Sequence, residues 1–371
     1  MSQLLHQQLS RVVLSRCPSY SKWHQIRKLV TKTTDPFHPE VSDVIDVRAP
    51  LEYEVDHIPG AVNLPVLDDN QRTEVGTVYS KDSFEARKLG ASLVSRNIAD
   101  HITNYFSAKR QEYCPLVYCW RGGQRSQSLA IVLSQTGFRV KVLDGGYRTY
   151  RRAVIRDLEH LPHHLTFKVI TGLTGSGKTL LLHTLQEHGA QVLDLEGLAR
   201  HKGSLLGLWH QDKQPSQKLW ESHLRHHLTT YDPARPVWVE SESRKVGRLI
   251  IPPALFSKMC EGDRVEVCVP TAERIKHILN DYPHWIEDSE ALKQVLTPLK
   301  KIRGQQMLDA WFRLIDQGKW EEFIESLLLE HYDITYTVSQ KKNSLAKEKD
   351  VVQMDDLSEK SCLQFVHQVL Q

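Results

Sequence analysis

Long apolar runs and closely spaced cysteines are both missing from this sequence of 371 residues. No apolar stretch is long enough to span a bilayer, so no membrane is expected among its partners. The six cysteines stand at positions 17, 114, 119, 260, 268 and 362 without C-x-x-C spacing. That scatter argues against a zinc site and against a disulfide scaffold, and it favours a reducing compartment. The net charge of +3 is too small to indicate nucleic-acid binding by itself.

Acidic residues are absent from the first 34 positions, which carry several arginines, lysines, serines and threonines. This composition is typical of an organelle transit peptide, and the alternative is a disordered leader. Both interpretations place residues 1–34 outside the fold. The expected location is cytoplasmic, or the mitochondrial matrix or another organelle if the segment is a transit peptide.

The strongest pattern in the sequence is a strand, a glycine loop and a helix around residues 166–179. Phe167, Val169 and Ile170 predict a buried strand, and the leucines after Thr179 predict a helix. Between them the chain fits G-x-x-x-x-G-K-[ST], which in this context predicts a phosphate-binding loop. Its backbone N–H groups, helix N-terminus and lysine would surround a phosphate or diphosphate. The expected binding residues are Gly172, Gly175, Ser176, Gly177, Lys178 and Thr179.

The fold class expected is α/β, with two successive domains. Residues 35–146 alternate strands with helices, which predicts a small parallel sheet. Residues 147–165 predict a basic helical connector. Residues 166–371 predict a second α/β domain of the P-loop type, with a helical C-terminal part and a charged tail from about residue 340. Within that tail, residues 363–370 are expected to form a docking helix.

Four arginines of the connector are spaced by three and four residues, so they share one helix face. They are Arg148, Arg151, Arg152 and Arg156. Such a face either contacts the phosphate backbone of tRNA or is a solvated surface between domains.

A second chemical site is expected at Cys119, which follows the short strand 116–118. Gly122 and Gly123 lie in its loop, and a helix is expected to begin close behind. Converging N–H groups, the helix N-terminus and the guanidinium groups of Arg121 and Arg125 would favour an anionic sulfur. Cys114, by contrast, is expected to be structural.

Glu240 stands directly after the strand 236–239, where the acid of a P-loop protein that binds magnesium would be expected. It could hold Mg²⁺ or orient a nucleophile, or it could be a strand-end carboxylate paired with Arg244 or Lys245. Glu242 lies on the same stretch. The other candidates for contacts to diphosphate or tRNA phosphate are Arg244, Lys245, Arg200, His201 and Lys202. No set of metal ligands can be named beyond this.

Several segments carry a resemblance to known families. Asp46-Val-Arg48, Glu52-Tyr53, residues 57–65 and the Cys119 loop resemble a rhodanese domain, in which the loop cysteine carries sulfur or selenium. Asp46 and Arg48 are then expected to support the loop rather than react. With residues 118–127, 193–199 and 240–245, a rhodanese domain placed ahead of a P-loop domain resembles the tRNA 2-selenouridine synthase family. The resemblance covers about residues 40–335.

The resemblance implies two reactions on 2-thiouridine in tRNA. The sulfur is first geranylated by geranyl diphosphate, and selenium from selenophosphate then replaces the geranylthio group. Cys119 and Lys178 would be the catalytic residues, and an enzyme that makes selenophosphate is a candidate partner. The alternative function is a small-molecule kinase fused to a sulfurtransferase, which ATP turnover on a hydroxyl acceptor would reveal. The sequence predicts neither the oligomeric state nor the set of tRNAs.

Overall fold

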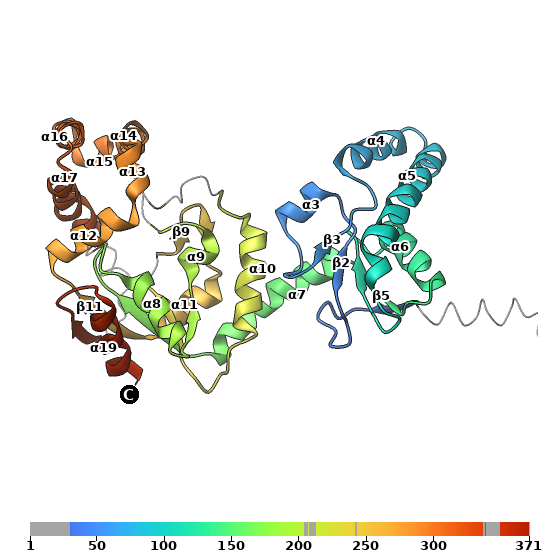
Figure 1. Ribbon diagram of the computed structural model, residues 1–371, viewed down its shortest axis with the longest axis horizontal. Helices are drawn as coiled ribbons and strands as arrows, with labels where there is room; N and C mark the ends of the chain where they lie inside the picture. Colours follow the sequence, from blue (N-terminus) through green and yellow to red (C-terminus); the bar gives the residue numbers. More distant parts are fainter. Residues whose placement is uncertain are drawn as a thin grey trace, which may run out of the picture. The chain divides into compact units, whose positions relative to one another are not determined.

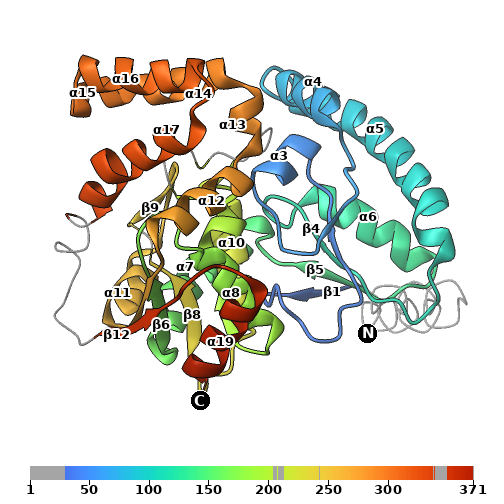
Figure 2. The same ribbon diagram turned by 60° about the vertical axis from the view of Figure 1, so that its left-hand side comes forward.

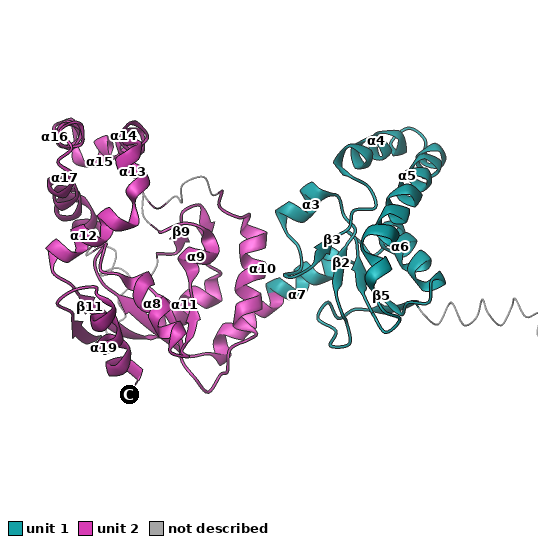
Figure 3. Ribbon diagram, in the orientation of Figure 1, with its two compact units in different colours: residues 1–155 teal, residues 156–371 magenta. Residues whose placement is uncertain are grey.

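The structure is a computed structural model that describes residues 30–203, 207, 213–241, 243–336, 338 and 349–370. The chain divides into two compact units, residues 1–155 and 156–371, shown in different colours in Figure 3. Helix α7, Tyr147–His160, crosses this boundary, and the 3₁₀ turn η2, Leu161–His164, follows it. The predicted connector 147–165 is therefore largely helical, and the boundary between the units falls inside its helix.

Unit 1 is built on a parallel sheet, which has five strands among the described residues, in the order β1-β5-β4-β2-β3. These strands are β1 (Val30–Thr33), β2 (Val44–Asp46), β3 (Val62–Asn63), β4 (Leu116–Tyr118) and β5 (Val140–Leu143). The connecting elements are α3 (Pro50–Val55), α4 (Asp69–Tyr79), α5 (Ser83–Asn104), η1 (Phe106–Ala108) and α6 (Gln124–Gln135). The apolar residues of the central strands, such as Ile45 and Val117, form one core with α6. This confirms the α/β class predicted for the unit.

Strand β1 corrects the predicted end of the leader. Val30–Thr33 pairs in parallel with β5, from Val30 opposite Val140 to Thr33 opposite Leu143. The boundary at residue 34 is therefore wrong by four residues, because these residues belong to the sheet. Thr31 and Lys32 are polar and exposed, which is ordinary at a sheet edge and gives little strand signal in the sequence. Residues 1–29 of the predicted leader lie outside the described residues.

Unit 2 contains a second parallel sheet, again of five strands within the described ranges, in the order β12-β11-β6-β8-β7. Its strands are β6 (Phe167–Thr171), β7 (Gln191–Leu193), β8 (Val237–Glu240), β11 (Asp263–Cys268) and β12 (Lys349–Gln353). A small antiparallel pair, β9 (Lys245–Val246) with β10 (Leu249–Ile250), accompanies it. Because the strands of the large sheet are parallel, the loops after β6, β7 and β8 open at the same edge.

The helices of unit 2 fall into two groups. Those near the sheet are α8 (Lys178–Glu187), α9 (Leu195–Ala199), α10 (Gln217–Leu228), α11 (Pro253–Glu261) and α19 (Glu359–Leu370). The second group comprises α12 (Thr271–Asp281), α13 (Pro283–Glu287), α14 (Ser289–Leu296), η3 (Thr297–Leu299), α15 (Lys300–Arg303), α16 (Gln305–Asp316), α17 (Trp320–Leu327) and the π-helical turn η4 (Leu328–Tyr332). Figures 1 and 2 show this group as a helical cluster. It has an apolar core of its own around Leu296, Trp311 and Phe323.

The predicted charged tail is also corrected. Strand β12 pairs in parallel with β11, from Arg264 opposite Lys349 to Cys268 opposite Gln353, and so extends the sheet. Helix α19 packs against α8 (Figure 2) and buries Phe365 and Val366 in the core of unit 2. The expected docking helix is confirmed, but the chain from residue 349 onward is part of the fold rather than a tail. Within the described ranges, no helix combines the length and apolar character needed to cross a bilayer.

Candidate functional site: a phosphate loop and a buried cysteine loop

The glycine loop lies between β6 and α8, the arrangement that the motif requires. Gly175 and Gly177 adopt left-handed backbone conformations, with φ of 83° and 72°. A Cβ at Gly175 would lie 2.8 Å from Ile278 Cδ1 and 3.1 Å from the carbonyl oxygen of Arg274, so glycine is required there for space as well. The carbonyl of Thr174 accepts a hydrogen bond from Arg274 Nε at 2.8 Å. Helix α12 therefore fixes the shape of the loop.

Lys178, the first residue of α8, directs its ammonium group back over the loop. Its Nζ donates to the carbonyl of Gly172 at 3.1 Å and lies 3.5 Å from that of Leu173. These acceptors are neutral, and no salt bridge to Lys178 is found in the described part of the chain. The amide of Gly172 donates to the hydroxyl of Tyr336 at 2.8 Å. The charge of Lys178 therefore remains available to an anion placed on the loop.

A cleft of about 630 Å³ opens in front of the loop. Its lining includes Thr174, Gly175, Gly177, Lys178, Thr179, His183, Glu196, Lys202, Ser241, Ser243, His277, Asp281, Tyr282, Tyr332 and Tyr336. Of the predicted binding residues, Gly172 and Ser176 lie behind this surface. Ser176 is buried, and its Oγ has no hydrogen-bond partner in the described ranges. The cleft has room for a diphosphate and for a much larger attached group.

Glu240 lies deeper than the sequence suggested. Its side chain is fully buried, Oε1 accepts the amide of Glu196 at 2.9 Å, and Oε2 has no partner among the described residues. Burial, followed by the charges of Asp194 and Glu196, raises the pKa of Glu240 well above its ordinary value. Glu240 is not among the residues that line the cleft, and the described contacts do not pair it with Arg244 or Lys245.

Among the described residues, two acids line the cleft: Asp281, which is paired with Lys202, and Glu196, which was not predicted from the sequence. Its Oε2 accepts a hydrogen bond from Thr179 Oγ1 at 3.1 Å, and both residues line the cleft. A hydroxyl and a carboxylate are oxygen ligands of the kind that Mg²⁺ takes. No cluster of three or more metal-binding side chains is found within the described ranges. A magnesium ion would therefore fit at Thr179 and Glu196 if a phosphate ligand supplied further oxygens.

The other predicted phosphate contacts of unit 2 separate into distinct environments. Lys202 lines the cleft but forms an ion pair with Asp281, Nζ to Oδ2 at 2.7 Å. His201 is buried, and burial lowers its pKa. Arg200 and Arg244 are exposed, and neither appears in the described lining of the cleft. Glu242 lies outside the described residues.

Cys119 occupies the corresponding position in unit 1, directly after β4 and before α6. The side chain is buried and belongs to the core of the unit. Its Sγ lies 3.3 Å from Ser126 Oγ, which also donates to the carbonyl of Gly123 at 3.1 Å. In this state the thiol donates to Ser126, whereas rotation of the hydroxyl would let Ser126 donate to an anionic sulfur.

A turn of the same unit fills the space beside the cysteine loop. The amide of Tyr147 donates to the carbonyl of Cys119 at 2.8 Å. Gly146 has φ of 57°, and a Cβ there would lie within 2.5 Å of the amide nitrogen of Gly122. Trp120 stacks on Tyr147 with ring centroids 5.1 Å apart, so it covers this turn. The loop is closely packed, unlike the open glycine loop.

A buried ion pair of unit 1 supports the cysteine loop through the tyrosines beside it. Arg48 Nη2 lies 2.6 Å from Asp46 Oδ2, and both side chains are buried. Burial alone would lower the pKa of Arg48, but the hydrogen bond and charge of Asp46 outweigh it and raise that pKa. The guanidinium carbon lies 5.5 Å from the ring centre of Tyr118 and 4.3 Å from that of Tyr147. The pair thus contacts side chains on both sides of Cys119.

The loop arginines do not share one environment. Arg125 Nη1 forms an ion pair with Glu52 Oε2 at 2.6 Å, and this interaction lowers the pKa of Glu52 although burial acts to raise it. The charge of Arg125 is therefore partnered by Glu52, and its effect on the sulfur stays a prediction. Arg121 is exposed. Gly122, with φ of 67°, and Gly123 form the tight turn into α6.

The four connector arginines lie on α7 with unequal exposure. Arg148, Arg152 and Arg156 are exposed, whereas Arg151 is half-buried. Arg156 is held by Asp157, with Nη2 to Oδ1 at 2.9 Å, and Asp157 also accepts from Arg225 at 2.9 Å. Arg148 and Arg152 are therefore the arginines of this face that are exposed and form no ion pair among the described residues.

Three residues at the phosphate site were not predicted from the sequence: Glu196, Arg274 and Tyr336. Arg274 is buried and binds Asp333 with both terminal nitrogens, at 3.0 and 2.6 Å. Tyr336 reaches the loop from a segment 164 residues further along the chain. Only Glu196 had a signal in the sequence, since it lies in the segment 193–199 that carried the family resemblance. The other contacts depend on tertiary packing that no local pattern shows.

The fold and the two loops define a class: a two-domain α/β protein with a rhodanese-like sheet and a phosphate-loop sheet. Comparison with protein families supports both parts. The rhodanese-like domain family matches residues 30–153, and the family described as the tRNA 2-selenouridine synthase AAA domain matches residues 165–369. The chain belongs to the tRNA 2-selenouridine synthase family.

Similar proteins named tRNA 2-selenouridine synthase occur in several bacteria. That of Nitrosomonas europaea is 37% identical over 263 residues, covering 69% of this chain and 68% of that protein. That of Shewanella sediminis is 32% identical over 326 residues, covering 79% and 86%. That of Shewanella woodyi is 30% identical over 344 residues, covering 84% and 91%. The family match extends to residue 369, so the segment beyond residue 335 is shared with the family rather than a departure from it.

Proposed function

We propose that this chain is a tRNA-modifying transferase that converts 2-thiouridine to 2-selenouridine through a geranylated intermediate. Membership of a family whose relatives are named tRNA 2-selenouridine synthases supports the overall conversion. The observation that carries the two-step scheme is the presence of two different loops. One offers an open cationic cleft at Lys178, and the other offers a buried sulfur at Cys119.

The first step is assigned to the phosphate loop. The thiouridine sulfur attacks C1 of geranyl diphosphate, the S–C1 bond forms as the C1–O bond breaks, and the base releases its N3 proton. Negative charge grows on the departing diphosphate. Lys178 and the amides at the start of α8 are placed to stabilise that charge, which explains how such a loop could serve without hydrolysing a nucleotide. A magnesium ion held by Thr179 and Glu196 would add further stabilisation when bound.

The second step is assigned to the cysteine loop. Selenium from selenophosphate becomes bonded to C2 of the base, the C2–S bond breaks, geranylthiol leaves, and water accepts the phosphoryl group. Alkylation in the first step improves the sulfur as a leaving group. Cys119 is the polarisable side chain of the first unit that we assign to this transfer, with Ser126 as its hydrogen-bond partner. Asp46 and Arg48 keep the flanking tyrosines in place.

The tRNA is proposed to contact the exposed arginines of α7, with Arg148 and Arg152 contributing most. Selenophosphate would come from a separate enzyme that phosphorylates selenide.

The test uses the purified full chain with a tRNA that carries 2-thiouridine. Mass spectrometry of the nucleosides should show S-geranyl-2-thiouridine after addition of geranyl diphosphate, and 2-selenouridine after further addition of selenophosphate. Omitting geranyl diphosphate should prevent both products. Formation of 2-selenouridine at the same rate without geranyl diphosphate would overturn the two-step scheme. ATP-dependent phosphorylation of a small molecule, with unchanged tRNA, would favour the kinase alternative.

A further inference from the structure

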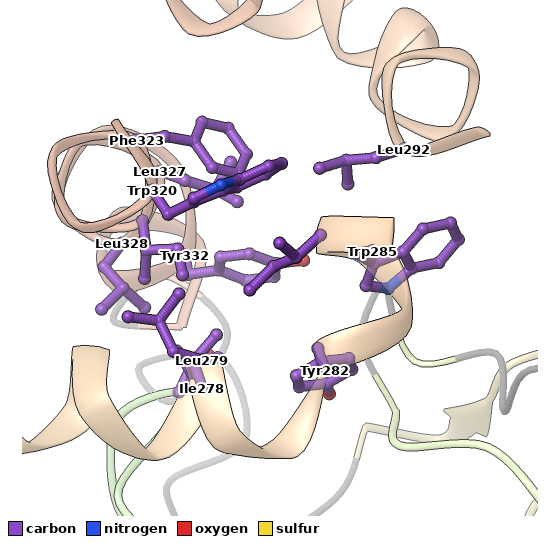
Figure 4. A pocket seen from close by; sticks show the side chains of 13 residues that line it. Ile278, Leu279, Tyr282, Trp285, Leu292, Trp320, Phe323, Leu327, Leu328 and Tyr332 are labelled. Carbon is purple, nitrogen blue, oxygen red and sulfur yellow. The ribbon is translucent and has the colours of Figure 1, made fainter. Parts of the chain in front are cut away.

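A second cavity lies in the helical cluster of unit 2, and its lining is much more apolar than the mixed lining of the cleft. It has a volume of about 50 Å³, and almost all of its lining is apolar (Figure 4). The walls come from α12, α13, α14, α17 and η4, and they include Leu279, Trp285, Trp320 and Phe323. We call this cavity the aromatic pocket.

The aromatic pocket and the phosphate cleft share part of their lining. Thr174, Ile278, Tyr282 and Tyr332 contribute to both. Thr174 belongs to the glycine loop itself, so the apolar pocket begins beside the place where a phosphate would sit. A ligand that spans both must have an anionic head and an apolar body.

A single buried side chain ties these two regions together. Arg274 donates to the carbonyl of Thr174 in the glycine loop and binds the carboxylate of Asp333, which directly follows η4. Helix α12, which carries Arg274, also supplies Ile278 and Leu279 to the pocket. The spacing between loop and pocket is therefore fixed by an ion pair rather than left to a flexible hinge.

We infer that the aromatic pocket binds the distal part of the prenyl chain of the diphosphate held at Lys178. This inference rests on the proposed function and adds the binding surface that selects the chain. The occupant is a methyl-branched hydrocarbon chain, because the cavity is small and almost all of its lining is apolar. An engineered apolar cavity of about 150 Å³ binds benzene, and this pocket has about a third of that volume, so it takes only the end of the chain.

The test compares two exposed isoleucines in the helical cluster. Ile286 lines the aromatic pocket and is 40% exposed, whereas Ile302 on α15 is 62% exposed and is not among the residues that line it. Ile286→Asp places a carboxylate beside the chain, where its desolvation opposes binding. Ile302→Asp is the matched control, with the same change in charge and side chain.

Binding is measured by calorimetry on the full chain, with geranyl diphosphate and with inorganic diphosphate. Wild-type protein should bind geranyl diphosphate at least tenfold more tightly than inorganic diphosphate. Ile286→Asp should weaken geranyl diphosphate by about tenfold or more and leave inorganic diphosphate within about twofold. Ile302→Asp should change neither. Retained binding of inorganic diphosphate also shows that the variant is folded.

A second variant tests the aromatic wall without adding charge. Trp285→Leu should reduce the preference for geranyl over inorganic diphosphate by severalfold. Equal affinity of the wild-type protein for the two ligands would overturn the inference, as would unchanged binding of geranyl diphosphate by both pocket variants.

Failure of this inference can be told apart from failure of the proposed function. If the pocket variants make S-geranyl-2-thiouridine with unchanged KM for geranyl diphosphate, the function stands and the pocket assignment falls. If geranyl diphosphate binds as expected but no geranylated tRNA forms, the pocket assignment stands and the proposed reaction falls.

Discussion

The two units place a loop at the same structural position and use it differently. In each, a central parallel strand ends, a glycine-containing loop turns, and a helix begins: β4 to α6 around Cys119, and β6 to α8 around Lys178. The glycine loop faces a cleft of about 630 Å³, whereas the turn at Gly146 and Tyr147 fills the space beside the cysteine loop. Both loops have the same strand–loop–helix backbone arrangement. They differ in the residues that pack against them, and those residues determine which ligand each loop can accept.

The charged groups around the two loops also differ. In unit 1, Arg48 is paired with Asp46 and Arg125 with Glu52, whereas Arg121 is exposed, so two of these three arginines carry a charge that is already partnered. In unit 2, Lys178 is hydrogen-bonded to carbonyl groups instead. Under the proposed function, the charge of Lys178, unpaired within the described residues, suits a departing diphosphate, whereas the step assigned to Cys119 releases geranylthiol and needs less added positive charge.

The largest effect is expected at the cysteine loop. Cys119→Ser keeps the shape of the side chain but removes the polarisable sulfur, so S-geranyl-2-thiouridine should accumulate with little or no 2-selenouridine. Cys114→Ser is the control, because Cys114 is a second buried cysteine of the same unit. Mass spectrometry of nucleosides distinguishes the products. Wild-type amounts of 2-selenouridine from Cys119→Ser would remove the assigned difference between the loops.

The support of the cysteine loop can be tested through stability. Arg48→Met leaves the Asp46 carboxylate buried without its partner, which should cost about 3–5 kcal/mol. Lys88→Met removes the exposed pair with Glu85 and should cost about 1 kcal/mol or less. Urea unfolding of unit 1 can be followed by labelling of Cys114 and Cys119, which unfolding exposes. Equal costs for the two substitutions would show that the buried pair is not what holds this loop.

Removal of the Lys178 charge at the glycine loop should slow the geranylation step alone. Lys178→Ala should reduce geranylation by roughly two to three orders of magnitude, as for removal of one preorganised donor. The exposed Lys301, on α15, provides the control Lys301→Ala. Supplying tRNA that is already geranylated should restore 2-selenouridine formation in Lys178→Ala but not in Cys119→Ser. Failure of that rescue would mean that the two loops do not act in separate steps.

The smallest effect is expected on α7, which belongs partly to each unit. Changing Arg148 and Arg152 together to Ala should weaken tRNA binding and reduce the slope of log K against log salt by about one to two. Arg156→Ala should have less effect, because Asp157 already holds that side chain. Filter binding at several salt concentrations gives both quantities. An unchanged slope in the double variant would return this face to the solvated-surface interpretation.

The sequence alone was sufficient for the α/β class, both loops and the family. These features are local: a buried strand, a glycine-bearing turn and a helix start lie within about fifteen residues, and side-chain periodicity and backbone conformation carry them. The helix of residues 363–370 was recognisable for the same reason. The order of two such motifs in one chain then pointed to the family, which the comparisons confirm.

Tertiary structure decided the features that join distant residues. Strands β1 and β12 lie at sheet edges and mix polar with apolar side chains, so pairing with β5 and β11 identifies them more clearly than their own pattern does. The burial of Glu240, the position of Glu196 in the cleft, the Arg274–Asp333 pair and the contact of Tyr336 with Gly172 depend on where separate elements pack. Sequence spacing fixes which face of one helix or strand a residue occupies, but only packing fixes what lies opposite, how deeply it is buried and which charge it meets.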